Sequence, residues 1–391
     1  MPVINRIAEF HDDMTAWRHD LHAHPELALQ EHRTSALVQQ KLREFGVDEI
    51  HTGLAKTGVV GVIRGHAAGG AIGLRADMDA LPILEETGAA YASTTPGVMH
   101  ACGHDGHTAM LLGAARYLAE TRNFAGTVYL IFQPAEERWG GMDIMIKEGL
   151  LQQCPMERVF ALHNWPLAPA GTILWRDGPM LAATASFDIT VTGIGAHAAQ
   201  PHLSRDPVLA AAQLVVALQG IVARNIDPLE AGVVTVGAIN GGDIHNVIPK
   251  AVTLMGTARW YSPQVGDQLE AGLRRVCAGI ATTCDVQIDL DYQRGYPATV
   301  NDPAANVLAR RAAASVVGAP RVQEMAAPVM GGEDFAFLLQ QRPGAFIALG
   351  SGRGHDDFNP HHPKFNFNDE VLPVGASYFV TLAEQILAKD P

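Results

Sequence analysis

The sequence has few cysteines, which cross-link small secreted proteins, and fewer basic than acidic residues, although basic residues are what bind polyanions. Its 391 residues include 4 cysteines, namely Cys102, Cys154, Cys277 and Cys284. They are too few and too scattered for a disulfide framework in a chain of this size. Lys and Arg number 28 against 41 Asp and Glu, for a formal net charge of -13. This excess of acid argues against nucleic acid and anionic membranes as partners, so we expect small molecules or further copies of the chain.

Long hydrophobic runs are also missing. The sequence has no run of 18 consecutive apolar residues, and its first ten residues lack the apolar segment of a signal peptide. We therefore expect a cytoplasmic protein without a membrane segment. Hydrophobic residues still make up 48% of the chain, which is enough for a large core. A chain of this length is expected to form about two domains.

Histidine, in contrast, is plentiful, and residues 100–107 read His-Ala-Cys-Gly-His-Asp-Gly-His. Thiolate and imidazole are the usual donors to zinc. Cys102 and His104 are separated only by Gly103, so a turning backbone lets both side chains approach one ion. The alternative is a polar loop ahead of the apolar helix expected at residues 108–119. We favour a metal site, which then needs further ligands from elsewhere in the chain.

The order of apolar segments predicts an α/β fold with an insertion. Helices are expected at residues 4–21 and 34–45, and strands at 58–64, 71–76, 127–132 and 158–162, with the first two strands forming a hairpin or neighbouring pair. This alternation predicts a parallel or mixed sheet with helices on both faces. From residue 182 the order becomes strand, helix, two strands, helix, strand, which is the split ferredoxin-like arrangement. We therefore expect an α/β domain from residues 1–181 and 295–391, and an inserted α+β domain from residues 182–294.

Chemically active side chains follow three of the expected strands. Asp77 and Asp79 follow the strand at 71–76, Glu136 and Glu137 follow that at 127–132, and His163 follows that at 158–162. Open α/β sheets carry their active sites at the carboxyl ends of strands. For the aspartates a solvated loop is an equally good interpretation. For the adjacent glutamates we favour a site, because paired carboxylates persist best beside a cation.

Two further segments have clear interpretations. Residues 193–198 formally match the G-x-G-x-x-A dinucleotide fingerprint. Pro201 prevents a helix from opening there, and no acidic strand end follows at about 20 residues, so we do not expect a nucleotide site. The loop at residues 352–367 holds His355, His361 and His362. A loop of that length without regular structure is more often functional than not.

Taken together, these motifs resemble a known family. They are the segments at residues 77–82, 100–107, 133–137, 163–164, 195–197, 246–249, 331–335 and 361–363. In order and in detail they resemble the two-metal aminoacylase and carboxypeptidase superfamily. The most similar branch contains hippurate hydrolases, N-acyl-amino-acid amidohydrolases and plant auxin-conjugate hydrolases. The resemblance spans nearly the whole chain, from about residue 17 to the closing helix.

The resemblance implies a centre of two divalent metal ions, zinc or manganese, with cobalt or nickel as other possibilities. The residues that match the family's ligands are Cys102, His104, Glu137, His163 and His361. Glu136 matches the catalytic carboxylate, and Asp79 matches a position that orients a ligand from behind. His361 is preferred over His362 by alignment alone.

The resemblance also implies that the inserted domain is a lid and a dimerisation domain. His197 matches a histidine that reaches the active site of the partner subunit in a homodimer and stabilises the negative charge of the transition state there. Asn246 matches a residue that assists it, and Arg259 matches a residue that binds the substrate carboxylate. The alternatives are a turn amide for Asn246 and a surface ion pair for Arg259.

The function implied is metal-dependent hydrolysis of the amide bond of N-acyl amino acids, with Glu136 as general base. A dipeptidase or carboxypeptidase of the same superfamily is the nearest alternative. From other classes we consider a hydrolase with Cys102 as nucleophile, and a metal-binding protein without activity. The first leaves four residues without a role, namely Glu136, Glu137, His163 and His361, and the intact Glu136 speaks against the second.

Overall fold

The structure is a computed structural model that describes residues 3–354 and 357–388. Its internal contacts divide the chain into two compact units. The first unit comprises Met1–Met180, Thr299–Pro328 and Asp334–Pro391, and the second comprises Leu181–Ala298 and Val329–Glu333. In sequence, therefore, most of the second unit is inserted between two parts of the first.

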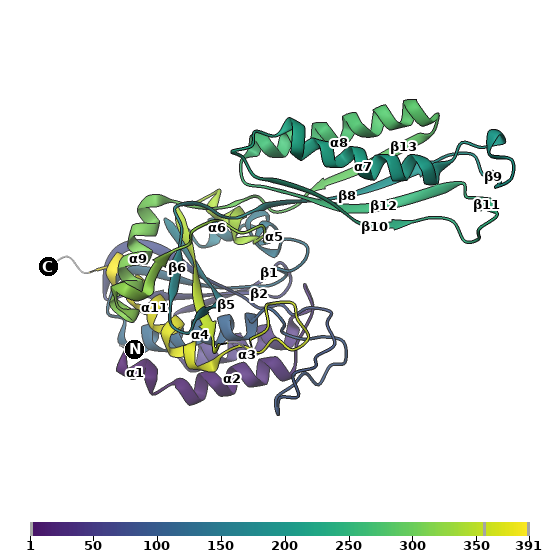
Figure 1. The fold of residues 1–391 in the computed structure, drawn as a ribbon. Coiled ribbons are helices and arrows are strands. Elements are labelled where there is room, and N and C mark those ends of the chain that lie inside the picture. The colour runs from purple at the N-terminus through teal and green to yellow at the C-terminus, as the bar shows by residue number, and fades with distance from the viewer. Residues whose placement is uncertain (1–2, 355–356, 389–391) are drawn as a thin grey trace. The chain divides into compact units, whose positions relative to one another are not determined.

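The first unit is built on an eight-stranded sheet in the order β1-β2-β4-β3-β5-β16-β6-β15 (Figure 1). These strands are β1 (Glu49–Leu54), β2 (Gly58–Arg64), β3 (Ala67–Asp77), β4 (Ala125–Gln133), β5 (Arg158–Pro169), β6 (Ile173–Trp175), β15 (Val322–Glu324) and β16 (Gly344–Gly352). β4, β3, β5 and β16 run parallel, whereas β2 pairs antiparallel with β1 and β4. The sheet is mixed, as the sequence predicts.

The predicted hairpin or neighbouring pair of β2 and β3 is wrong. β4 lies between the two strands, pairing antiparallel with β2 and parallel with β3. A parallel pair needs a long crossover between its strands. The segment between β3 and β4 contains the helix α4 (His104–Thr121) and is long enough for such a crossover, and the two strands pair in parallel.

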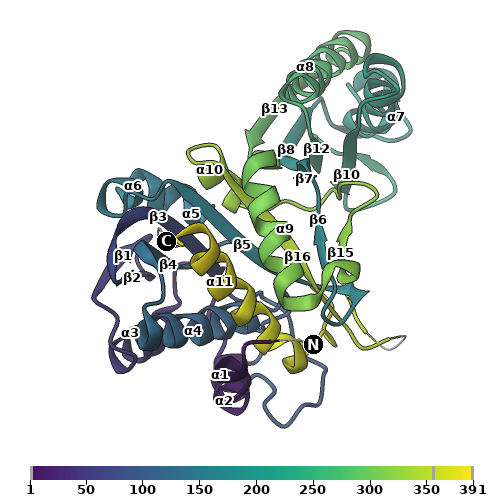
Figure 2. The same cartoon turned by 90° about the vertical axis from the view of Figure 1, so that its left-hand side faces the viewer.

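Helices cover both faces of this sheet (Figure 2). On β2, a Cβ added to Gly58 would lie 3.1 Å from Met145, and one added to Gly61 would lie 3.1 Å from Leu42. Positions three apart on a strand point to opposite faces. The α3 helix (His32–Glu44), which holds Leu42, and the α5 helix (Gly141–Lys147), which holds Met145, therefore lie on opposite faces. This confirms the predicted two-sided layering.

The first unit and its borders contain ten further short or long elements, and the first two differ from the prediction. They are α1 (Asn5–Ala8), α2 (His11–Ala23), α6 (Leu150–Gln153), α9 (Pro303–Val317), α10 (Phe335–Leu339), α11 (Leu372–Ile386), β7 (Gly178–Leu181), β14 (Thr299–Asn301), η2 (Ala319–Arg321) and η3 (Asp369–Val371). The single helix expected at residues 4–21 is two helices, because the chain leaves helical geometry at Phe10. Phe10 is fully buried in the main core.

The second unit is a four-stranded antiparallel sheet in the order β10-β12-β8-β13, packed with two helices (Figure 1). Its elements are β8 (Ala183–Thr192), α7 (Pro207–Asn225), β10 (Gly232–Asn240), β12 (Ala251–Trp260), α8 (Pro263–Cys284) and β13 (Gln287–Arg294), with the short β9 (Ala196–His197), β11 (Val247–Ile248) and η1 (Pro201–Leu203). The order strand, helix, two strands, helix, strand is the ferredoxin-like order that the sequence predicts.

The α7 helix is the most apolar helix of this unit. With a mean hydropathy of 1.6, it is long and apolar enough to cross a membrane by length and composition alone, although it contains no strictly apolar run of that length. Core helices of globular proteins pass the same test. Here α7 packs against α8 and β10, and Leu214 and Leu218 are fully buried. About 33% of its 18-residue apolar window is buried, so α7 packs one face into the second unit and leaves the rest exposed.

Candidate metal centre

The motif at residues 100–107 straddles the start of α4. The helix begins at His104, so His104 and His107 lie in its first two turns, whereas Cys102 lies just before it. Gly103 makes the turn between them with a φ of 96°, and a Cβ there would overlap Oδ1 of Asn164. Only glycine fits a left-handed backbone so close to a neighbour. The turn at Gly103 thus lets the side chains of Cys102 and His104 approach one point from different directions.

The two glutamates lie in a turn that follows β4. Asp79 fixes this turn, because its Oδ1 accepts the backbone N–H of Glu136 at 3.1 Å and its Oδ2 accepts that of Glu137 at 3.0 Å. Oδ1 of Asp79 also accepts from Nδ1 of His104 at 3.2 Å. One buried carboxylate therefore contacts both an expected metal ligand and the turn that carries the expected catalytic residue.

His163 lies within β5 and not beyond its end, which corrects the sequence prediction. β16 pairs with β5 through His163 and Asn164, and this pairing extends the strand to Pro169. Nδ1 of His163 donates to the carbonyl oxygen of Asn164 at 2.8 Å. Nε2 is therefore the unprotonated nitrogen of the neutral ring, and it lies 3.4 Å from Sγ of Cys102. A nitrogen held in this way is ready to bind a metal ion.

The predicted ligands fall into three overlapping groups, one of which joins His104 and His163 to Asp77 and His107. Ligand atoms of Cys102, Glu137 and His361 lie within 4.8 Å of one another, and so do those of His104, Glu136 and Glu137. Glu137 belongs to both of these last two groups. Its carboxylate therefore lies beside the donor atoms of both groups.

The two candidate histidines of the long loop differ in their surroundings. Nε2 of His361 lies 3.2 Å from Oε1 of Glu137. The ring of His362 instead stacks on Phe358, with centroids 4.2 Å apart. The structure thus places His361, and not His362, beside the other candidate ligands. His355, in the same loop, lies outside the described residues.

The charges at this place favour a cation. Burial lowers the pKa of His104, but the carboxylates of Asp77, Asp79 and Glu137 outweigh it and raise this pKa to about 10. Nε2 of His104 is buried without a hydrogen-bond partner among the described residues. Buried polar atoms without partners are rare in proteins. Together with the nearby thiol and imidazoles, this nitrogen fits a divalent metal centre.

The pKa of Cys102 is unlike that of a nucleophilic cysteine. Burial raises the pKa of its thiol well above the ordinary value, and the nearby Glu137 and Glu136 raise it further. A nucleophilic cysteine needs the opposite shift. A bound divalent cation would supply it, because a coordinating thiol is deprotonated.

His107, also part of the opening motif, is occupied by the protein itself. Its Nδ1 lies 2.6 Å from Oδ1 of Asp77, and its Nε2 accepts the backbone N–H of Asn164 at 2.9 Å. Asp77 in turn accepts from Nη1 of Arg75 at 2.8 Å. Both ring nitrogens of His107 are thus engaged by neighbouring residues of the site. Local sequence patterns give no sign of Arg75, because it lies within an apolar strand.

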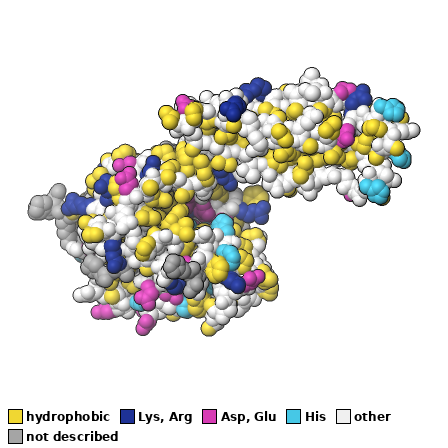
Figure 3. Space-filling model, viewed as in Figure 1, with side chains coloured by type: hydrophobic (Ala, Val, Ile, Leu, Met, Phe, Trp, Pro, Cys, Tyr) yellow, Lys and Arg dark blue, Asp and Glu magenta, His cyan; other side chains and the backbone are white. Residues whose placement is uncertain are grey.

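Three predicted residues lie in the second unit. His197 in β9 and Val247 in β11 are paired residues, and Asn246, next to Val247, accepts the N–H of Ala198 through its carbonyl oxygen at 3.0 Å. Figure 3 shows histidine side chains gathered at one end of this unit. Arg259 lies on β12 with its side chain half-buried, and burial lowers its pKa. Their roles toward the metal centre remain predictions.

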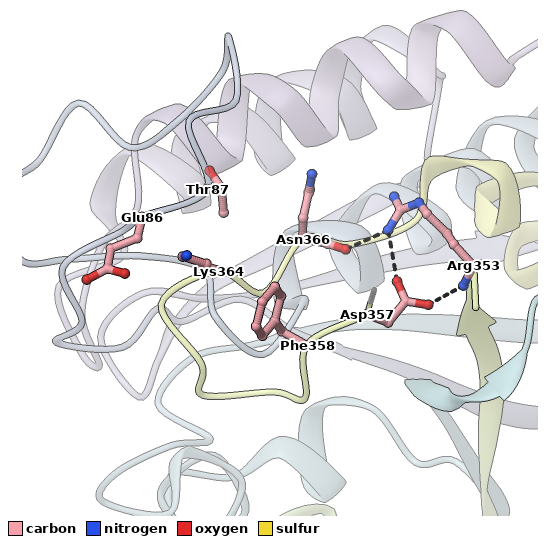
Figure 4. A pocket seen from close by; sticks show the side chains of 7 residues that line it. All are labelled: Glu86, Thr87, Arg353, Asp357, Phe358, Lys364 and Asn366. Carbon is pink, nitrogen blue, oxygen red and sulfur yellow. Dashed lines mark hydrogen bonds and ion pairs between the residues drawn. The ribbon is translucent and has the colours of Figure 1, made fainter. Parts of the chain in front are cut away.

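A cavity of about 470 Å³ flanks the loop that carries His361 (Figure 4). Its lining consists of Glu86, Thr87, Arg353, Asp357, Phe358, Lys364 and Asn366. The Arg353 guanidinium donates to the carbonyl oxygens of Asn366 and Phe367 at 2.9 and 2.7 Å. These bonds tie the beginning of the loop to its end and so brace the segment that presents His361.

Comparison with known proteins gives the same family along the whole chain. Residues 73–385 match the model of peptidase family M20/M25/M40. Hippurate hydrolase of Campylobacter jejuni is 39% identical over 99% of this chain and 100% of its own length. N-acetyl-L-cysteine deacetylase of Bacillus subtilis is 43% identical over 93% of this chain and 85% of its own length. The crystal structure of a dinuclear metal binding M20 peptidase from Bacillus subtilis superposes with a TM-score of 0.82, at 35% identity, covering 97% of this chain and 99% of that one. The chain therefore belongs to peptidase family M20/M25/M40.

Proposed function

We propose that this protein hydrolyses the amide bond of N-acyl amino acids and releases a carboxylic acid and a free amino acid. One observation carries the proposal. Glu136 stands next to Glu137, whose carboxylate joins the group of Cys102 and His361 to that of His104. A proton acceptor beside a set of metal ligands is what hydrolysis by an activated water requires.

The substrate class draws support from the relatives. Hippurate and N-acetyl-L-cysteine, the compounds in their names, are both amino acids with an acyl group on nitrogen. The two relatives thus share the bond that is cut and differ in the acyl group. We therefore define the substrate class by its N-acyl amino acid linkage, and the substrate panel below tests which acyl group is preferred.

Cys102, His104, Glu137, His163 and His361 would hold two divalent metal ions, zinc or manganese in our proposal, with cobalt or nickel as further candidates. When bound, the ions supply Lewis acidity that polarises the scissile carbonyl and acidifies water. The neutral His163 gives an unprotonated nitrogen, because burial lowers its pKa well below the ordinary value. Glu137, with its pKa lowered chiefly by His361 and His104 against the opposing effect of burial, gives a carboxylate.

Glu136 accepts the proton of the attacking water at its carboxylate and delivers it to the leaving nitrogen. General acid–base catalysis of this kind contributes about 10²- to 10⁴-fold to a rate. The side chain is only 7% exposed, and its backbone is fixed by Asp79. Little reorganisation is then needed at the moment of proton transfer.

We extend the proposal to a homodimer in which the second unit completes the site of the partner subunit. His197, exposed on β9, would stabilise the developing oxyanion there, with help from Asn246. Arg259 would bind the carboxylate of the substrate, for which a guanidinium offers two parallel hydrogen bonds. Loss of turnover in His197→Ala with unchanged metal content would support this arrangement. A cytoplasmic location remains a prediction.

The test is a panel of N-acetyl, N-benzoyl and N-succinyl amino acids, with short dipeptides as controls, in which both products are identified. The proposal expects cleavage of N-acyl amino acids and a loss of about 10²-fold or more in kcat for Glu136→Gln at unchanged metal content. Preferred cleavage of peptides would favour the dipeptidase or carboxypeptidase alternative. A Glu136→Gln enzyme with ordinary turnover would overturn the assigned base.

A further inference from the structure

Three consecutive backbone N–H groups of the catalytic turn donate to two buried carboxylates. Asp79 takes those of Glu136 and Glu137, as described above, whereas Oε1 of Glu31 takes that of Ala135 at 2.9 Å. Asp79 lies in a motif beside the site. Glu31, 104 positions before Ala135 in the sequence, has no role so far.

Glu31 stands at the N-cap of α3 and yet does not cap that helix. Its side chain makes no capping hydrogen bond. The N–H groups of Arg33 and Thr34 in the first turn are accepted instead by the two carboxylate oxygens of Glu26, each at 2.9 Å. A carboxylate at a helix start normally serves those N–H groups. Here Glu26 serves them, and Glu31 turns away from its own helix toward the turn after β4.

The carboxylate of Glu31 is fixed from several directions. Oγ1 of Thr57 donates to its Oε2 at 2.7 Å, and the backbone N–H of Leu29 donates to its Oε1 at 3.1 Å. The residue is fully buried. Burial raises the pKa of this carboxyl to about 7, and Asp79 acts in the same direction against the hydrogen bond from Thr57. Burying an ionisable group costs free energy, and groups that are buried despite this cost are typical of functional sites.

The residue that Glu31 holds needs support. Ala135 is fully buried and has a φ of 59°, a left-handed conformation that residues with a side chain rarely adopt. Its carbonyl oxygen accepts the N–H of Gly141 at 3.0 Å. Both backbone polar groups of Ala135 are thus fixed, the N–H by Glu31 and the carbonyl oxygen by the start of α5. Strained backbone of this kind persists only where the surroundings determine it.

We infer that Glu31 is a positioning residue, which acts through Ala135 to hold the turn that presents Glu136 and Glu137. The inference rests on the proposed function. Without the acceptor at Ala135 the turn can relax toward an ordinary backbone conformation, and the carboxylate of Glu136 moves relative to the water it must deprotonate. Displacements of about 1 Å at this distance from the chemistry cost roughly 10²-fold in rate.

The experiment compares the kinetics of Glu31→Ala and Glu31→Gln. For Glu31→Ala we expect kcat to fall by about 10²-fold, while KM changes by less than about threefold and bound metal stays at the wild-type level. Glu31→Gln should recover most of the rate, because its amide oxygen can still accept the N–H of Ala135. Thr57→Val, which frees the carboxylate to rotate, should lower kcat in the same direction but by less.

Glu26→Ala is the matched control. It removes a carboxylate that accepts two backbone N–H groups near the same helix, but it does not touch the catalytic turn. We expect a lower melting temperature and an unchanged kcat. If Glu31→Ala fails to fold, the comparison of Thr57→Val with Glu26→Ala carries the test alone.

Two results would overturn the inference. One is a kcat for Glu31→Ala or Thr57→Val equal to that of wild type. The other is an equal loss of kcat in Glu26→Ala, since that loss would follow from stability alone. Wild type and Glu136→Gln are measured in the same assay. They distinguish a failure of this inference from a failure of the proposed function. Inactive wild type, or fully active Glu136→Gln, contradicts the proposed function and the inference with it.

Discussion

Oδ1 of Asp79 and Nδ1 of His104 lie 3.2 Å apart, and the same carboxylate holds the N–H groups of Glu136 and Glu137. Asp79→Asn keeps the shape of the side chain but replaces one acceptor with an NH₂ group. We expect metal affinity to fall by about 10- to 100-fold, as is usual when the partner of a ligand histidine is lost. Competition with a chelating dye measures this. Unaltered affinity would mean that the contact does not orient His104.

Cys102 separates the metal hypothesis from the cysteine-nucleophile alternative. If Cys102 is a ligand, Cys102→Ala should lose bound metal and activity together, because one donor of the group with Glu137 and His361 is gone. Metal analysis of the purified variant, alongside its turnover, gives the answer. Full metal content without activity would instead identify Cys102 as a nucleophile.

His361 and His362 form a natural pair of variants. Nε2 of His361 lies 3.2 Å from Oε1 of Glu137. The ring of His362 instead stacks on Phe358, which lines the cavity in Figure 4. We expect His361→Ala to lower metal content and to reduce kcat by at least about 10²-fold. His362→Ala, the control, should keep its metal and lose less than about tenfold. The reverse order would reassign the ligand.

Glu31 predicts a pH dependence of stability. Because burial raises its folded-state pKa from 4.5 to about 7, the folded protein binds this proton more tightly than the unfolded chain. The resulting stability is full below pH 4.5 and is lost as the pH rises toward 7. Glu31→Gln cannot ionise. Its free energy of unfolding, measured in urea, should therefore improve relative to wild type across this range, and a constant difference would contradict the shift.

Much of the fold follows from local sequence. Asp302, an aspartate directly ahead of α9, accepts the N–H of Ala305 as its N-cap, and the second unit has its predicted order of elements. The strand order was beyond local reasoning. That β4 separates β2 from β3 depends on the crossover through α4, which fixes a parallel pair that no segment specifies alone.

The candidate site divides in the same way. Cys102 and His104 stand together in one motif, so their chemistry is visible in the sequence. Glu137 and His361 join them only through the fold, and their assignment as ligands rests on the family resemblance. The strand through His163 is longer than predicted, because its pairing with β16 decides where it ends. Glu31 has no local signal, since its partner Ala135 is distant in the chain.

Metal dependence is the central claim, and one measurement tests it most directly. Turnover of hippurate and N-acetyl amino acids is followed before exhaustive chelation, after it, and after adding back zinc, manganese or cobalt, with bound metal quantified at each stage. We expect activity to disappear with the metal and to return with at least one of these ions. Undiminished turnover in protein shown to be free of metal would contradict the account.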